Sequence, residues 1–194
     1  MQTTRLRKMT GTAMLGAVAT VLMFIDFSVP TMPSFIKMDV SELPALIASF
    51  AYGPLSGIAV CLIKNLINLT RTSTAGVGEL CNFMLGVCFV LPAGLIYLRR
   101  KSRSTAAIGA LVGAACMAVL SVPVNYFITY PVYTNFMPLD TIIGMYQAIF
   151  PGVDGLLQCL VVFNLPFTFV KGLIDAGLTF LVYKPLSPIL HGRH

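Results

Sequence analysis

Hydrophobic runs separated by short polar segments dominate the chain, and their lengths predict membrane-spanning helices. A span needs about 20 apolar residues, so a chain of 194 residues suffices for about six spans with short connections. We therefore expect an all-α integral membrane protein with six transmembrane helices, folded as one domain over residues 1–194. The predicted helices cover residues 10–27, 42–51, 55–69, 79–97, 104–128 and 163–184.

The connections between these runs differ in character. Residues 28–41 contain two prolines and two charged residues, and residues 70–78 are polar and glycine-containing, so both segments are predicted to be loops. Gly53-Pro54 separates the second and third runs, because proline is tolerated in the first turn of a helix. One long kinked helix is the alternative. Residues 131–165 form a long connection that is apolar enough to hold a short interfacial helix.

The last hydrophobic run carries a polar stripe. Asn164, Thr168, Lys171 and Asp175 are spaced by four, three and four residues, which places them on one face of a helix. A lysine near the bilayer centre costs about 3 kcal/mol even on lenient insertion scales, so it should face a cavity or a partner. The stripe is our first functional-site hypothesis. The alternative is a structural pair at i, i+4, in which Lys171 and Asp175 satisfy each other.

The other polar residues of the predicted helices converge on the same side of the membrane. They fall on or near the halves of the helices that face away from the basic loops, whereas the opposite halves are nearly featureless, as expected for a binding pocket that opens outward. This set comprises Asp39, Lys64, Asn68, Glu79, Asn82, Asn125, Asn164, Thr168 and Lys171, of which all except Lys64 and Asn68 are predicted to bind the ligand. Two members have a simpler alternative: Lys64 can snorkel to the interface, and Glu79 can be a partner of the helix macrodipole.

Composition and charge support this interpretation. The chain is 57% hydrophobic and only 10% charged, which is typical of polytopic membrane proteins. Its net charge of +6 comes from three basic clusters at helix ends, which contain no acidic residue: Arg5, Arg7 and Lys8; Arg99, Arg100, Lys101 and Arg103; and Lys184 and Arg193. The positive-inside rule then predicts that both termini are cytoplasmic, in the cell membrane, and no nucleic-acid partner is expected.

Catalytic and metal-binding patterns are absent from the sequence. The five cysteines are scattered singly in apolar runs, and both histidines lie within the last four residues, so neither a metal site nor a disulfide framework is expected. No metalloprotease, serine-hydrolase or nucleotide-binding motif is present, which argues against an enzyme. We find no inverted repeat of the kind that many stand-alone carriers show. In the first helix, Ala13 and Ala17 form a small-xxx-small step that permits close approach of another helix.

Four segments of the chain resemble the riboflavin-binding S components of energy-coupling-factor (ECF) transporters. They read KMDVSELPALIASFAYGPLSGIAVCLIKNLINL, GVGELCNFMLGVCFVLPAGLIY, VNYFITYPVY and PFTFVKGLI. The resemblance implies a six-helix substrate-binding subunit that captures riboflavin, as a transported ligand and not a cofactor, on the extracytoplasmic side. It also implies a membrane coupling subunit and two ATPases as partners, with Ala13 and Ala17 on the coupling face.

The resemblance implies roles for individual residues as well. Glu79, Asn125 and Lys171 are candidates to hydrogen-bond the flavin, and Asp39 belongs to the loop that closes the site. A flat ring also suits aromatic stacking, for which Tyr126 and Tyr130 are candidates, with simple packing as the alternative for each. Thr168 departs from the family pattern, which has asparagine at this position, and Asn164 can compensate one turn earlier. This departure keeps an S component for another ligand, such as a flavin analogue, pantothenate or folate, open as the alternative, with a stand-alone carrier behind it.

Overall fold

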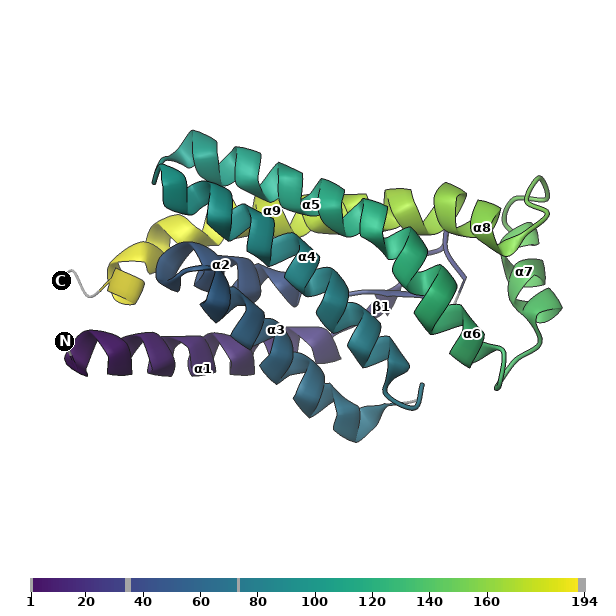
Figure 1. The fold of residues 1–194 in the computed structure, drawn as a ribbon, viewed down its shortest axis with the longest axis horizontal. Coiled ribbons are helices and arrows are strands. Elements are labelled where there is room, and N and C mark those ends of the chain that lie inside the picture. The colour runs from purple at the N-terminus through teal and green to yellow at the C-terminus, as the bar shows by residue number, and fades with distance from the viewer. Residues whose placement is uncertain (1, 34–35, 73, 192–194) are drawn as a thin grey trace.

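The structure is a computed structural model that describes residues 2–33, 36–72 and 74–191. Figure 1 shows an elongated bundle of helices that run mostly along its long axis. The elements in chain order are α1 (Gln2–Phe24), β1 (Phe27–Ser28), β2 (Lys37–Met38), α2 (Glu42–Tyr52), α3 (Pro54–Asn68), η1 (Leu69–Arg71), α4 (Val77–Arg99), α5 (Arg103–Val124), η2 (Asn125–Thr129), α6 (Tyr130–Tyr133), α7 (Leu139–Gln147), α8 (Leu156–Cys159), η3 (Leu160–Asn164) and α9 (Leu165–His191).

Helix α2 is the centre of the bundle although it is only 11 residues long. It contacts α1, α3, α4 and α9, and Ala45, Leu46 and Ala48 are completely buried. Gly53 ends the helix with a φ of 100°, a conformation that residues with a Cβ rarely adopt, and Pro54 opens α3. The prediction of two helices joined by a tight turn is confirmed, and the single kinked helix is wrong.

Small residues bring α4, α5 and α9 close together. A Cβ built on Gly109 would lie 2.8 Å from the carbonyl oxygen of Ala93 in α4, and one built on Gly172 of α9 would lie 2.8 Å from the side chain of Ala114 in α5. Backbones can approach this closely only where side chains are minimal, as is common between helices in membranes. The glycine- and alanine-rich composition of α5 therefore fixes α4 and α9 on either side of it.

The end of the bundle opposite the chain termini departs most from the sequence predictions. In the segment predicted to be a loop, residues 28–41, Ser28 and Lys37–Met38 take part in a two-stranded antiparallel ribbon, in which Phe27 pairs with Met38 and Ser28 with Lys37. The short helix predicted within the long connection is present as α7. The last span begins at Leu156, earlier than the predicted start at residue 163, and the fifth extends through η2 to Tyr133. The first helix also begins earlier than predicted, at Gln2.

Two π-helical turns, η2 and η3, interrupt these long helices. A single π turn inside an α-helix shifts the side chains that follow it and is frequent at functional sites. Asn125 is the first residue of η2, and Asn164 is the last residue of η3. Both asparagines were predicted as site residues, and both lie where the helix is locally rewound.

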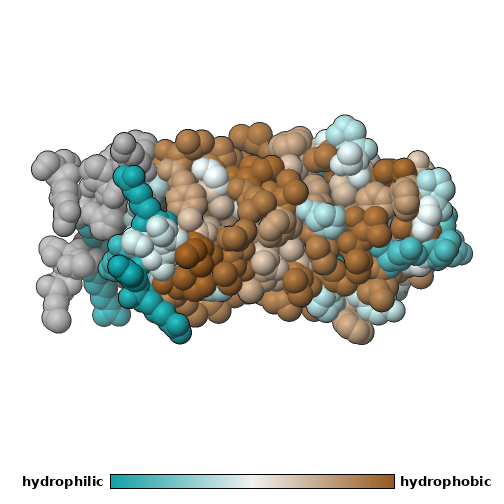
Figure 2. Space-filling model, turned by 90° about the horizontal axis from the view of Figure 1, so that it is seen from above, coloured by the Kyte–Doolittle hydropathy of each residue, from teal (hydrophilic) through white to brown (hydrophobic). Residues whose placement is uncertain are grey.

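The surface matches a protein that lies in a membrane. Within the described residues, three helices are long and apolar enough to cross a bilayer, namely Val77–Arg99, Arg103–Tyr133 and Leu156–Tyr183. Figure 2 shows a broad hydrophobic surface between hydrophilic residues near the two ends of the molecule. The start of α1, the turn between α4 and α5 and the end of α9 lie at one end (Figure 1), so the first two basic clusters share that end. Arg193 lies outside the described residues.

Candidate functional site

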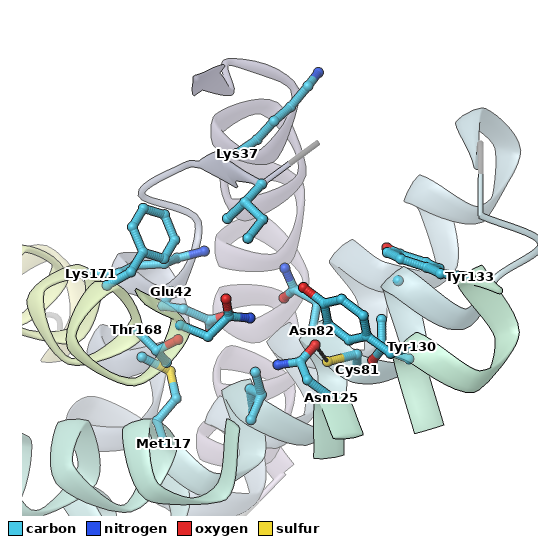
Figure 3. Close-up of a pocket in the computed structure, with 16 residues that line it drawn as sticks. Lys37, Glu42, Cys81, Asn82, Met117, Asn125, Tyr130, Tyr133, Thr168 and Lys171 are labelled. Atoms are coloured by element: carbon cyan, nitrogen blue, oxygen red, sulfur yellow. Dashed lines mark hydrogen bonds between the residues drawn. The ribbon is translucent and has the colours of Figure 1, made fainter. Parts of the chain in front are cut away.

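A cavity of about 180 Å³ opens between α4, α5, α9 and the β1–β2 ribbon. We call it the first cavity. Its apolar walls come from Ile36, Leu85, Met117 and Phe167. In Figure 3, Asn82, Asn125 and Tyr130 lie on one side of the open space, and Glu42, Thr168 and Lys171 lie on the other. The site is therefore an apolar slot with amides, hydroxyls, a carboxylate and the ammonium groups of Lys37 and Lys171 at its edges.

Five of the seven predicted ligand-binding residues line this cavity. They are Asn82, Asn125, Asn164, Thr168 and Lys171. The other two, Asp39 and Glu79, line a second cavity of about 290 Å³, whose described lining is mostly polar. The two cavities are neighbours, because both are lined by Lys37, Gly78 and Asn82. The Asn82 Oδ1 atom is buried and has no hydrogen-bond partner within the described part of the chain, which leaves an acceptor for a ligand.

Lys171 forms an ion pair with Asp39, in the connection between β2 and α2, and not with a residue of its own helix. Its Nζ lies 2.9 Å from Asp39 Oδ2, and the two side chains are only 13% and 8% exposed. The predicted alternative of a self-satisfied pair with Asp175 is wrong, because both carboxylate oxygens of Asp175 lack a hydrogen bond within the described residues. Asp175 lies one turn after Lys171 on the same helix and is therefore within reach of it. The ammonium group of Lys171 instead pairs with Asp39, 132 residues away in sequence.

Asp39 is held ionised by its surroundings. Burial favours the neutral carboxyl, whereas the charges of Lys171 and Lys64 favour the ionised form, and the Ser41 backbone N–H donates a hydrogen bond to Oδ1 at 2.9 Å. Together with the hydrogen bond from Lys171, these contacts lower the pKa of Asp39 well below its ordinary value. The connection between β2 and α2 is therefore tied to α9 by a charged link at the edge of the first cavity.

A second buried ion pair lies beside the first. Lys64 Nζ lies 2.5 Å from Glu42 Oε1 and donates to Ser41 Oγ at 2.6 Å, and the Lys64 side chain is completely buried. The snorkelling alternative for Lys64 is therefore wrong. Sequence reasoning did not select Glu42, which lines the first cavity. The sequence does indicate Glu42, because Lys64 lies inside an apolar helix and requires a partner, and Glu42 is the carboxylate at the start of the neighbouring helix.

Glu79 is held by a polar loop at the rim of the second cavity. Its Oε1 accepts from Asn68 Nδ2 at 3.1 Å, and its Oε2 accepts from the Thr72 and Thr74 hydroxyls at 3.0 and 3.3 Å. Glu79 also lies in the first turn of α4, as its alternative reading as a macrodipole partner requires. These contacts fix the carboxylate before any ligand is bound.

The two buried asparagines of the first cavity have distinct surroundings. Asn125 donates from Nδ2 to the Ser121 carbonyl at 2.8 Å, and Cys81 Sγ donates to its Oδ1 at 3.7 Å. Asn164 Oδ1 accepts from the Tyr146 hydroxyl at 2.9 Å. Tyr130 lines the cavity, as its predicted role requires, whereas Tyr126 does not and packs edge-on against Phe127 at the surface.

Ala13 and Ala17 lie on the open face of α1. Both are exposed, and the exposed Met14 and Val18 flank them, whereas Thr12, Gly16 and Ala19 face the bundle. In the part of the chain that the structure describes, the small-xxx-small step therefore faces away from the bundle. It is available to a partner helix.

Comparisons with known proteins agree with one another. The family model described as the substrate-specific component of ECF transporters matches residues 7–183. The chain is 34% identical over 188 residues to riboflavin transporter FmnP of Bacillus subtilis (strain 168), which covers 95% of this chain and 94% of that protein. It is 32% identical over 178 residues to riboflavin transporter RibU of Staphylococcus aureus (strain TCH60), which covers 92% and 89%. A solved S component of a bacterial ECF transporter matches with a TM-score of 0.76 at 30% identity, over 96% of this chain and 98% of that chain.

Proposed function

The chain belongs to the family of substrate-specific components of ECF transporters, and we propose that it is the riboflavin-binding subunit of such a transporter. In this role it captures the vitamin on the extracytoplasmic side of the cell membrane. It then delivers the vitamin through association with a membrane coupling subunit and two ATPases. The similar proteins named riboflavin transporters, which are transport components and not enzymes, support this proposal.

The observation that carries the proposal is the chemistry of the first cavity. Isoalloxazine is a flat apolar ring system with carbonyls and nitrogens along one edge, so it fits an apolar slot with a few amides and one cation at the rim. Met117 and Phe167 supply apolar walls, and Asn125, Asn164 and Lys171 supply edge contacts. The ammonium of Lys171 carries three N–H donors, so it can keep Asp39 and still donate to a ring carbonyl.

The second cavity suits the ribityl chain. Its lining combines Asp39, Asn68, Glu79 and Thr74 with Asn82, a set of acceptors and donors that matches a row of hydroxyl groups. It meets the first cavity at Asn82, so a ligand with a ring at one end and a polyol at the other can occupy both. This division gives Asp39 and Glu79 a ligand-binding role that the first cavity alone does not provide.

The proposed topology has six spans with both termini in the cytoplasm. The basic clusters that share one end of the bundle support this orientation through the positive-inside rule. Ala13 and Ala17 on α1 then form the surface that meets the coupling subunit, because they are small, exposed and unpaired with any other helix of the described chain. The sequence contains no phosphate-binding loop, so the partner ATPases supply the energy for import.

The test is a riboflavin titration of the purified protein in detergent, followed by quenching of the vitamin's own fluorescence. The chain has no tryptophan, so the flavin signal is free of protein tryptophan emission. Saturable quenching at submicromolar riboflavin is expected. A folded, monodisperse protein that does not quench riboflavin would refute the ligand assignment. Thr168 would then direct attention to other vitamins, and a panel of flavin analogues, pantothenate and folate would be titrated next.

A further inference from the structure

Tyr146 is completely buried, whereas the other residues of the short helix α7 are half-buried or exposed except for Ile142. It does not line the first cavity. Its ring packs against Phe163 at a centroid distance of 5.2 Å, and Ile142, one turn earlier, is the other buried residue of the helix. Helix α7 is therefore anchored to the bundle through a tyrosine whose hydroxyl points to the neighbourhood of the site.

Three side chains form a hydrogen-bond chain at this point. The hydroxyls of Tyr130 and Tyr146 lie 2.5 Å apart, and the Tyr146 hydroxyl donates to Asn164 Oδ1 at 2.9 Å. Because Tyr146 uses its one hydrogen on Asn164, Tyr130 must donate to Tyr146. Tyr130 also interacts with the Asn164 side chain, so the three groups form one closed, buried cluster. Tyr130 and Asn164 both line the first cavity.

The direction of this chain decides what Asn164 can offer to a ligand. An asparagine amide can present either its carbonyl oxygen or its two N–H donors, depending on which end is already used. Here Tyr146 occupies the oxygen. At most one of the two Nδ2 hydrogens is used by Tyr130, so at least one donor is left for the cavity.

We propose that Tyr146 is a positioning residue of the ligand site: it fixes the Asn164 amide so that Asn164 acts as a donor, and the ligand must present an acceptor there. This inference rests on the proposed function and makes it more specific. A ring carbonyl or an unprotonated ring nitrogen fits the position, whereas a ligand with an N–H or O–H at the same place leaves two donors facing each other. Asn164 then supplies the amide group that is missing at Thr168, one turn along the stripe, where the family pattern has asparagine.

The test is a double-mutant cycle of riboflavin affinity with Tyr146→Phe and Asn164→Ala. Tyr146→Phe removes one hydroxyl that does not line the first cavity. We expect the dissociation constant for riboflavin to rise about threefold to tenfold, the range that corresponds to one hydrogen bond. If Tyr146 acts through Asn164, the same substitution in the Asn164→Ala background should change affinity by less than about twofold. Tyr126→Phe, which removes a surface hydroxyl outside the cavity, is the matched control and should leave affinity unchanged.

The thermal unfolding midpoint of each variant is also measured without ligand, to separate a positioning role of Tyr146 from a role in supporting the fold. A merely structural role would lower affinity equally in both backgrounds, and that result, or unchanged affinity of Tyr146→Phe, would overturn the proposal. Asn164→Asp, measured at pH 8, provides a second variant that does not depend on the folding of Tyr146→Phe. It keeps an acceptor for Tyr146 but removes the donors, so it should weaken binding at least tenfold; wild-type affinity would overturn the donor assignment. Failure of the wild-type protein itself to bind riboflavin would instead refute the proposed function, and this inference with it.

Discussion

Replacing Lys171 by methionine tests the charged edge of the first cavity directly. Methionine has a similar length and no charge, so Lys171→Met removes the ammonium group with little change in volume. If the lysine donates to the ligand, a charged hydrogen bond worth about 1.5–3 kcal/mol is lost, which corresponds to a decrease in affinity of between about tenfold and about a hundredfold. The assay is the riboflavin quenching titration.

The substitution also acts on the protein without ligand, because Lys171 is the partner of Asp39. Both side chains are largely buried, and their atoms are 2.9 Å apart. Removing one member of a buried pair typically costs about 3–5 kcal/mol, because the other charge is left uncompensated. Asp39 retains the Ser41 N–H and the charge of Lys64, so we expect about 3 kcal/mol, at the lower end of that range.

The double variant Lys171→Met with Asp39→Asn separates the two effects. Removing both charges abolishes the uncompensated carboxylate, so stability should recover while riboflavin affinity stays low. Unfolding can be followed with a thiol-reactive dye, because Cys61, Cys81 and Cys159 are buried in the folded protein. Unchanged affinity of Lys171→Met, or affinity that returns in the double variant, would show that the lysine only supports the fold and would refute the ligand contact.

Four further outcomes are expected from the same structure. Ala13→Leu should leave riboflavin binding intact and abolish riboflavin uptake by cells, because a large side chain blocks the exposed small-xxx-small face; normal uptake would remove the coupling assignment. Thr168→Asn should tighten riboflavin binding in the titration, and loss of binding would indicate a pocket adapted to another ligand. The pKa of Asp39 is lower in the folded than in the unfolded protein, so its contribution to stability is present above about pH 4 and is lost as pH falls further; acid unfolding of Asp39→Asn should lack that component, and identical acid profiles would contradict it. Lys64→Met should lower the unfolding midpoint strongly and Lys64→Met with Glu42→Gln much less, because the first leaves a buried carboxylate alone; equal midpoints would argue against the pair.

Local periodicity was sufficient to find the polar stripe on α9, because the face of a helix is determined by spacing alone. It could not find the partner of Lys171. Asp175 satisfies the i, i+4 rule, yet the ion pair forms with Asp39, which approaches only because α2 and its preceding connection pack against α9. Lys64 shows the same limit: its requirement for a partner was predictable from its place in an apolar helix, but the choice of Glu42 depends on how α2 and α3 pack.

The π turns mark a second limit of the sequence interpretation. A helix of 3.6 residues per turn predicts the positions of Asn125 and Asn164 only to the extent that the helix is regular. In the folded chain both asparagines lie in rewound turns, which places their amides beside Cys81 and Tyr146. Nothing in the apolar residues around them distinguishes a π turn from an α turn, because apolar side chains are compatible with both conformations. The sequence therefore did not identify Tyr146 as a site residue, because its role depends on a contact between α7 and η3, and both segments are apolar.

Lys171 connects the first cavity to the β1–β2 ribbon. Its ammonium group lines the first cavity and also holds Asp39, which continues directly from β2. With three N–H donors, it can hold the carboxylate and a ligand carbonyl at the same time, so the two contacts reinforce each other instead of competing. The ion pair therefore holds the connection between β2 and α2 at the edge of the first cavity.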